Sequence, residues 1–458
     1  MLKSLLLAFA LIAVSLAQPD TAWLFTYPAS EFGESQPLAA FFDDTGNVYV
    51  AGWSQKKPER PDLLLLKIDS LGHLVWERTY DGVTAVGAAR DKSGNIYVTG
   101  FSDDTSDGWL HTLKYTPSGD LEWAKSYGEP PPQYQYSYVG SIVLDDSQNV
   151  HVCDKSDSAS CTVVRIIKYR PDGVLANVMS YTPGKTTSLS WGGRFHILND
   201  GGAYLAMTIA SRPEGWPPHL LVVRLSSQGQ VLWQKTYREG DSTWDDIEWS
   251  QVDENANIYT TGHANTHDGP ERFSTMKMDS SGKVMWTREY PHSKNNEGGD
   301  GFLLLHKGSV YVASGRDTIT LVKYDSLGNQ LWLSKYGNGD FELGYGQGYD
   351  EDHPGFCPMS VDDSGNIYIT GDGLDEYRTG KGTAVDSLFA FLVKYDPQGR
   401  PVWERRRPWT NKGPDGLFDL DWTGAIVGLD KKGATYDIGV SRVSSRVRGI
   451  YVLKYRTR

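Results

Sequence analysis

The hydrophobic pattern is clearest between Asp362 and Trp403, where short apolar runs alternate with polar turns. Residues Asn366 to Thr370 read Asn-Ile-Tyr-Ile-Thr, a composition that strands favour. The Asp-x-x-Gly sequence before them is typical of a tight turn, because Asp bonds its own backbone and Gly allows a positive φ. The next run, Leu388 to Tyr395, is apolar on both alternating faces. Such a strand has to be covered on both faces, which indicates small sheets packed between neighbouring sheets.

This unit recurs along nearly the whole chain. It is marked by a Tyr in the second strand, a Lys near the end of the third, and a fourth strand in which Trp precedes Tyr by four positions. Each of the three marks has eight copies. Two copies of the Trp/Tyr pair are altered, at Asn177/Tyr181 and Trp403/Arg407. His151 replaces the Tyr in one second strand, and Arg224 replaces the Lys in one third strand. A weaker apolar strand precedes each second strand. The pattern therefore predicts an all-β fold, a single eight-bladed β-propeller of four-stranded antiparallel blades.

The two ends of the chain predict how the ring closes. Residues Ala22 to Tyr27 match the fourth strand of the unit, and Tyr451 to Tyr455 match the third. We therefore expect the N-terminal strand to complete the C-terminal blade that begins at Trp422. Closure of this kind leaves no open sheet edge between the chain ends.

The first residues have the pattern of a secretion signal. Lys3 is the charged end, Leu5 to Val14 the apolar core, and Ser15-Leu16-Ala17 a small-x-small cleavage sequence. The apolar run is too short to span a bilayer, so no membrane span is predicted. We expect residues 1–17 to be a signal peptide, residues 18–458 to be the propeller, and the protein to be secreted, either extracellular or periplasmic.

The acidic balance of the chain limits its partners. The formal net charge is −12, and removal of Lys3 with the signal makes it −13. This charge disfavours nucleic acid and anionic membranes and is compatible with calcium or cationic ligands. We expect a monomer.

The repeat resembles a known family. Asp91 to Gly100 reads Asp-x-x-Gly-Asn-Ile-Tyr-Val-Thr-Gly, and Lys114 to Trp123 reads Lys-Tyr-x-x-x-Gly-x-x-x-Trp. Both are similar to the bacterial SBBP-type β-propeller repeat, which implies an extracellular protein of mostly unassigned role. The family name implies seven blades, whereas the count of repeats in this chain argues for eight. Asp325 to Trp332 is similar to the tryptophan-docking motif of eight-bladed quinoprotein propellers, although the adjacent-cysteine pair of the dehydrogenases is missing, so no cofactor is expected.

Repetition indicates the role of the marked residues. A stripe of Trp and Tyr on one strand face could serve as a sugar platform, but its presence in nearly every blade favours packing between blades. A catalytic lysine is needed once, whereas this Lys recurs in seven blades. We expect it to pair with turn carboxylates or to cap strand edges.

Three cysteines are few for a secreted chain. Cys153 ends one predicted strand and Cys161 begins the next, so the two could form a disulfide across the loop. They could equally remain free, because a short closed loop gains little stability. Cys357 is expected to be unpaired.

The long, irregular connections are predicted to share one face of the ring, opposite the tight turns. They are longest around blade seven, where Gly337 to Gly355 enters, Asp372 to Leu388 crosses between second and third strands, and Pro408 to Trp422 leaves. Variable loops on a rigid scaffold are where function tends to lie. Calcium ligands would be Asp350 and Asp352, since Ca²⁺ prefers carboxylate oxygens. Residues proposed to bind a sugar or a basic peptide are Glu342, Tyr345, Tyr349, Glu351, His353, Asp372, Asp375, Asp419, Asp421 and Trp422. The alternative is that these are solvated Gly-rich loops.

Motifs of known enzymes are mostly absent. The chain has no G-x-S-x-G, no H-E-x-x-H and no Walker loop. His263, His267 and Asp268 could ligate a metal, but no further ligand is specified. No catalytic or cofactor-binding residue is therefore assigned. The pattern favours a non-catalytic protein that binds extracellular polysaccharide or protein through the blade-seven loops, and the alternative is a glycan-active hydrolase or lyase that uses carboxylates at the same face.

Overall fold

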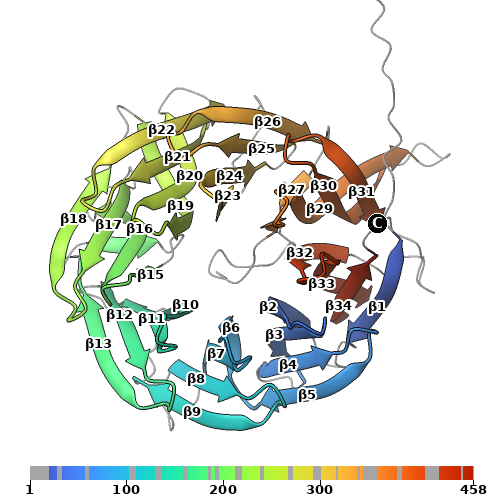
Figure 1. Cartoon of the computed structure of the whole chain (residues 1–458), viewed down its shortest axis with the longest axis horizontal. Helices are drawn as coiled ribbons and strands as arrows, with labels where there is room; N and C mark the ends of the chain where they lie inside the picture. Colours follow the sequence, from blue (N-terminus) through green and yellow to red (C-terminus); the bar gives the residue numbers. More distant parts are fainter. Residues whose placement is uncertain are drawn as a thin grey trace, which may run out of the picture.

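The computed structural model describes residues 20–27, 34–56, 61–102, 110–128, 137–157, 162–183, 187–190, 195–211, 219–237, 242–266, 272–291, 301–315, 318–337, 341–343, 358–378, 384–407, 422–444 and 447–456. These residues form 34 β-strands, and none of them is helical. The strands group into eight sheets set around a common axis (Figure 1). The predicted eight-bladed propeller is confirmed.

Each blade has four antiparallel strands in radial order, from the innermost outwards. Blade one has β2 (Ser35–Phe42), β3 (Val48–Ser54), β4 (Asp62–Ile68) and β5 (Leu74–Tyr80). Blade two has β6 (Thr84–Arg90), β7 (Ile96–Phe101), β8 (Leu110–Tyr115) and β9 (Leu121–Tyr127). Blade three has β10 (Ser137–Leu144), β11 (Val150–Asp157), β12 (Thr162–Tyr169) and β13 (Leu175–Tyr181). Blade four has β14 (Thr187–Ser190) and β15 (Phe195–Ile197), which share the innermost position, then β16 (Ala203–Ser211), β17 (His219–Leu225) and β18 (Val231–Tyr237).

The other four blades follow the same order. Blade five has β19 (Ser242–Val252), β20 (Ile258–Thr266), β21 (Arg272–Met278) and β22 (Val284–Pro291). Blade six has β23 (Gly301–His306), β24 (Ser309–Ser314), β25 (Ile319–Tyr324) and β26 (Gln330–Tyr336). Blade seven has β27 (Phe341–Leu343) and β28 (Met359–Val361), which share the innermost position, then β29 (Ile367–Arg378), β30 (Ala384–Tyr395) and β31 (Pro401–Arg407). Blade eight has β32 (Trp422–Leu429), β33 (Thr435–Ser444), β34 (Val447–Tyr455) and β1 (Thr21–Tyr27).

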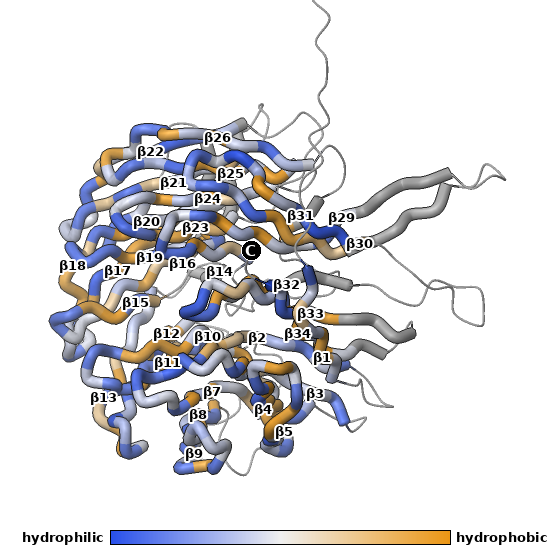
Figure 2. The backbone as a smooth tube through the Cα atoms, turned by 45° about the vertical axis from the view of Figure 1, so that its right-hand side comes forward, coloured by the Kyte–Doolittle hydropathy of each residue, from blue (hydrophilic) through white to orange (hydrophobic). Residues whose placement is uncertain are grey.

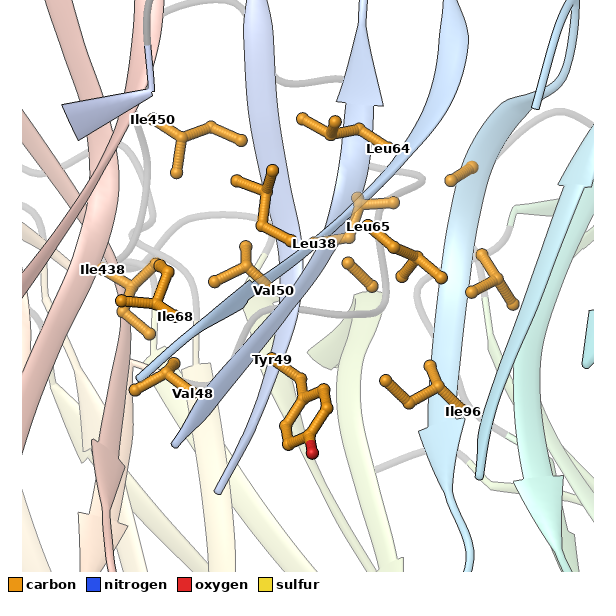
Figure 3. Packing of buried hydrophobic residues seen from close by; sticks show 14 of the residues in the cluster. Leu38, Val48, Tyr49, Val50, Leu64, Leu65, Ile68, Ile96, Ile438 and Ile450 are labelled. Atoms are coloured by element: carbon orange, nitrogen blue, oxygen red, sulfur yellow. The ribbon is translucent and has the colours of Figure 1, made fainter. Parts of the chain in front are cut away.

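The core lies between the blades, as expected for strands that are apolar on both faces. Leu63 to Leu66 alternate between the two faces of β4, and all four are fully buried. One hydrophobic cluster joins Ile438 of blade eight, Val50 of blade one and Ile96 of blade two (Figure 3). Hydrophobic positions accordingly run through the strands all around the ring instead of gathering on one side (Figure 2). Burial of one such side chain contributes about 1.5–3 kcal/mol, so the ring is held chiefly by these interfaces.

Six of the eight turns between first and second strands begin with an Asp whose carboxylate accepts backbone hydrogen bonds, seen clearly before β29. The carboxylate of Asp362 accepts hydrogen bonds from the backbone N–H groups of Ser364 and Asn366, both at 2.9 Å. It also accepts one from Asn366 Nδ2 at 2.7 Å and one from the hydroxyl of Tyr368 at 3.1 Å. Gly365 has a φ of 84°, which a residue with a Cβ adopts only with strain. The Asp-x-x-Gly-Asn-x-Tyr repeat is therefore a self-contained turn that also positions the buried Tyr.

The repeated lysine has a structural role, as its repetition predicted. Lys394 Nζ lies 5.2 Å from the centre of the Tyr368 ring. Lys277 makes the same contact in blade five and also donates to the carbonyl of Ser326 in blade six at 3.0 Å. The predicted pairing with a turn carboxylate occurs in blade three, where Lys168 contacts Asp145 at 3.1 Å.

The repeated tryptophan joins six of the eight blades to the next one. The indole Nε1 of Trp286 in blade five donates to the carbonyl of Ser326 in the blade-six turn at 3.3 Å. A Cβ added to Gly328 of that turn would lie 2.7 Å from the Trp286 ring. Matching contacts join Trp23 to Gly72, Trp76 to Gly119, Trp123 to Gly173, Trp233 to Gly282 and Trp332 to Gly399. The Gly of the repeat is thus required by the ring that covers it, and the predicted packing role of the Trp is confirmed.

The ring closes as predicted, by the N-terminal strand. β1 pairs with β34 in antiparallel register from Thr21↔Tyr455 to Tyr27↔Ile450. The hydroxyl of Tyr27 donates to Glu77 of blade one at 2.7 Å, which joins the closing strand to the next blade. The closure leaves no third-to-fourth turn in blade eight, because the chain ends meet there. Trp403 of blade seven packs against Tyr455 with ring centres 6.1 Å apart, as Trp286 does against Tyr324 at 5.8 Å, but among the described residues it covers no turn glycine.

The structure does not support the disulfide that was one of the two alternatives for the cysteines. Cys153 is a free, buried thiol whose cross-strand neighbour on β12 is Ile166. The β11–β12 ladder continues outwards from there to Asp157↔Thr162, so Cys153 lies well inside the hairpin instead of at its open end. Cys161 and Cys357 lie outside the described residues.

Candidate functional site

Strand order decides which connections share a face. Each described turn between first and second strands, and between third and fourth strands, is short and emerges at one end of the ring. The antiparallel order places second-to-third and blade-to-blade connections at the other end. We call that other end the long-loop face. The described strands that differ most from the repeat belong to blade seven.

The innermost strand of blade seven is interrupted. β27 pairs with β29 at Leu343↔Gly371, and β28 resumes at Met359↔Ile369. Blade four is also split at this level, between β14 and β15, but only residues 191–194 separate its two strands, and blade one has only a bulge between Pro37 and Ala39. The carbonyl of Pro358 accepts a hydrogen bond from the N–H of Thr370 at 2.9 Å, so the returning chain is fixed to β29. Residues 344–357 are therefore inserted within the strand nearest the ring axis. The predicted entering connection, Gly337 to Gly355, contained the first half of this strand, and that part of the prediction was wrong.

Most of the predicted ligand residues cannot be placed. Glu342 lies in β27 at the register position opposite Asp372 of β29. Asp375 lies in β29 opposite Ser387, and Trp422 begins β32. The residues outside the described part of the chain are Tyr345, Tyr349, Asp350, Glu351, Asp352, His353, Asp419 and Asp421. The calcium ligands Asp350 and Asp352 therefore remain a prediction.

A buried polar contact joins β29 of blade seven to β33 of blade eight. Asp437 of β33 is 1 % exposed, and its Oδ1 accepts hydrogen bonds from the Thr370 hydroxyl at 3.2 Å and the Tyr451 hydroxyl at 3.1 Å. Asp372, two residues beyond Thr370, is also buried. Burial of a carboxylate is costly unless its hydrogen bonds are made. The Tyr451 bond satisfies Asp437 within blade eight, and the Thr370 bond joins it to blade seven. Sequence reasoning missed Asp437, although it follows the repeat Tyr at a position where blades one to three carry valine.

The crossing segment of blade seven is an extended hairpin, not a loop. β29 and β30 have twelve residues each, and their ladder continues without a break from Asp372↔Ala390 to Arg378↔Ala384. The sequence prediction of a connection from Asp372 to Leu388 was therefore wrong for most of its length. The glycines and carboxylates of the segment resemble a loop in composition, but pairing between the strands decides the conformation.

Another buried charge lies in blade three, at the repeat position that is Gly52 in blade one. The carboxylate of Asp154 accepts a hydrogen bond from Arg165 Nη1 at 2.9 Å. Burial raises the pKa of Asp154, and the charge of Arg165 opposes that rise. The pair lies within the sheet, so it supports the hairpin.

The described residues contain no group of three or more His, Cys, Asp or Glu side chains placed to hold a metal ion. Of the three metal ligands considered from the sequence, His263 lies in β20, and His267 and Asp268 lie outside the described ranges. Within those ranges, no helix has the length and apolar character needed to cross a membrane.

Comparison with known proteins bears on the fold alone. No family model matches the sequence, and no curated protein matches it either. The crystal structure of the C-terminal WD40 domain of Sif2 is similar, with a TM-score of 0.53, 10 % identity, and coverage of 97 % of this chain and 99 % of that one. Sqt1 from Chaetomium thermophilum has a TM-score of 0.50 and 11 % identity, over 96 % of this chain and 100 % of that one. The polysaccharide lyase Uly1 reaches a TM-score of only 0.42, at 10 % identity over 92 % of this chain and 90 % of that one. The SBBP-type resemblance therefore stays a prediction.

Proposed function

We propose that this protein is a secreted, non-catalytic binding propeller that recognises extracellular polysaccharide or protein through its long-loop face at blade seven. The observation that carries the proposal is the departure of blade seven from the repeat. Its innermost strand is interrupted by residues 344–357, and its central hairpin extends beyond the neighbouring strands. Irregular segments on a rigid ring are where binding residues concentrate.

The composition of the inserted segment supports a polar ligand. Residues 344–357 include Tyr345, Tyr349, Asp350, Glu351 and Asp352. Aromatic faces and carboxylates together suit sugar hydroxyls or basic peptide segments, and adjacent carboxylates suit Ca²⁺. The residues that flank the segment, Leu343 and Pro358, both lie against β29.

The binding experiment measures the thermal unfolding midpoint of residues 18–458 in the presence of soluble oligosaccharides and polysaccharides, with and without Ca²⁺. Ligand at about 100 times its dissociation constant stabilises the folded state by roughly 2.7 kcal/mol, which raises the midpoint measurably. The shift should disappear in the variant Asp350→Ala with Asp352→Ala. Its persistence in that variant would place the site elsewhere.

Turnover distinguishes binding from the alternative activity, in which a glycan hydrolase or lyase uses carboxylates at the same face. A binding protein saturates and returns its ligand intact, whereas an enzyme releases shortened chains. Product analysis by mass spectrometry on any polysaccharide that raises the midpoint decides between the two.

Secretion is proposed from the signal-like residues 1–17. Expression of the full chain in a bacterial host, followed by mass measurement of the protein in the periplasm and the medium, tests it. A mature N-terminus at Gln18 is expected, and an intact chain confined to the cytoplasm would contradict it.

A further inference from the structure

The outer half of the β29–β30 hairpin is a two-stranded ribbon. Its ladder runs for five residue pairs beyond the rest of the blade, from Leu374↔Leu388 to Arg378↔Ala384. On one side, β27 pairs with β29 no further than Gly373. On the other side, β31 pairs with β30 no further than Ala390. Among the residues that the structure describes, no third strand therefore pairs with this ribbon.

The sequence explains why the outermost strand stops short. β31 ends at Arg407, and the next residue is Pro408, which has no backbone N–H to donate to a ladder. The outer edge of β30 from Ala384 to Leu388 is thus left without a strand partner in the described part of blade seven. A row of strand N–H and C=O groups of this kind is a template for another extended segment. A ribbon of two strands is also marginally stable in water and gains from a third.

The register of the ribbon sets the charge that a third strand needs. Glu376 and Asp386 occupy directly opposite positions, and like charges placed opposite each other destabilise a strand pair. The ten paired residues of the ribbon contain one further carboxylate, Asp375, and one cation, Arg378. A third strand with a cation at the register position next to Asp386 would set an opposite charge beside these two carboxylate positions, and opposite charges on neighbouring strands are favourable.

We propose that the edge of β30 between Ala384 and Leu388 receives an extended segment of a partner protein, which places Lys or Arg beside Asp386. Backbone hydrogen bonds supply affinity in this mode, and the side chains in register supply specificity. The inference rests on the proposed function, since it assigns a partner class to the same long-loop face. A second copy of the chain is the competing occupant, because the β33–β34 hairpin of blade eight has Arg442 opposite Arg448.

The test uses a fluorescein-labelled ten-residue peptide of alternating Thr and Lys, with residues 18–458 as the binding protein. Fluorescence anisotropy measures the dissociation constant, and hydrogen exchange with mass spectrometry locates the contact. We expect binding with slowed exchange at residues 384–388. Asp386→Lys should weaken binding about two- to five-fold for the changed cross-strand pair, and should improve binding of a Thr/Glu peptide. Asp386→Asn, with its thermal midpoint measured, shows whether the effect comes from charge or from misfolding.

Two controls separate strand addition from general charge attraction. Glu254→Lys makes the same charge change in an exposed turn at the opposite end of the ring and should leave binding unchanged. A Thr/Lys peptide with alternate backbone N–H groups methylated should not bind, because it cannot complete the ladder. Equal binding of the methylated peptide, or protection elsewhere than at residues 384–388, would overturn the proposal.

Two further outcomes also overturn it. One is no binding of the Thr/Lys peptide at concentrations up to about 1 mM. The other is protection of residues 384–388 by self-association that Arg448→Glu abolishes. A polysaccharide-dependent midpoint shift in the same preparation would leave the proposed binding function standing while the peptide-edge inference failed.

Discussion

The contact of Trp286 with the next blade gives a prediction whose size follows from the geometry. Trp286 is 7 % exposed, and its indole covers Gly328 while Nε1 donates to Ser326 at 3.3 Å. Trp286→Ala removes this buried ring and should lower the free energy of unfolding by about 3–5 kcal/mol. The Ser326 carbonyl keeps its hydrogen bond from Lys277, so most of the loss is packing.

The glycine beneath the ring makes the prediction sharper. Gly328 has a φ of 81°, and a Cβ there would lie 2.7 Å from the ring of Trp286. Gly328→Ala therefore costs about 1–2 kcal/mol for the left-handed backbone, plus the displacement of the ring. In the Trp286→Ala background only the backbone cost remains. The double variant should be more stable than the sum of the single effects predicts, by about 1 kcal/mol or more.

The assay is urea unfolding followed by far-UV circular dichroism and fluorescence, with coincident transitions required. Gly365→Ala is the matched control, because Gly365 has a φ of 84° and a Cβ there would meet nothing closer than Pro397 at 3.6 Å. It should combine additively with Trp286→Ala. Additive behaviour of Gly328→Ala with Trp286→Ala would refute the claim that the indole requires glycine in the turn.

Four further predictions test other parts of the ring. Deletion of residues 18–28 removes β1 and exposes the edge of β34, so the thermal midpoint should fall; an unchanged midpoint would contradict closure by this strand. Tyr451→Phe removes a donor to the buried carboxylate of Asp437 and should cost about 1–3 kcal/mol in urea unfolding, whereas no loss would mean that the contact is not stabilising. Burial would raise the pKa of Asp145, but hydrogen bonds from neighbouring groups outweigh it and lower the pKa from 3.8 to about 2. The carboxylate of Asp145 therefore stabilises the folded state above about pH 4, and this stabilisation is lost towards pH 2. In the variant Asp145→Asn, the thermal midpoint should fall less steeply between about pH 4 and pH 2. Burial raises the pKa of the Cys153 thiol well above its ordinary value, so iodoacetamide at pH 8 should label Cys153 only after unfolding, as read by peptide mass spectrometry.

Much of the fold could be predicted because its determinants are local and repeated. The hydrogen bonds of the Asp-x-x-Gly-Asn-x-Tyr turn all form within the turn itself, as they do from Asp362 to Tyr368. The same short sequence therefore predicts the same geometry wherever it recurs. Copies of the Trp, Tyr and Lys marks indicated the number of blades, and a lone fourth strand at Ala22 to Tyr27 indicated the closure.

The candidate site could be predicted only in its general position. Composition drew attention to blade seven, but it labelled Asp372 to Leu388 a loop, and the structure pairs most of this segment as strand. It also offered a Cys153–Cys161 bridge, whereas Cys153 lies opposite Ile166. In both cases nearby residues allow more than one register, and pairing with the neighbouring strand selects one.

The sequence by itself determined the strands, the turns, the count of eight blades and the closing strand, because each depends on residues close together in the chain or on their repetition. Only the tertiary structure decided that the innermost strand of blade seven is interrupted at residues 344–357 and that the β29–β30 ribbon extends beyond the neighbouring strands. It also decided that Thr370 of blade seven donates a hydrogen bond to Asp437 of blade eight. These features depend on strand register and on contacts between blades. Such contacts join residues that are distant in the sequence, so no periodic pattern in the sequence indicates them.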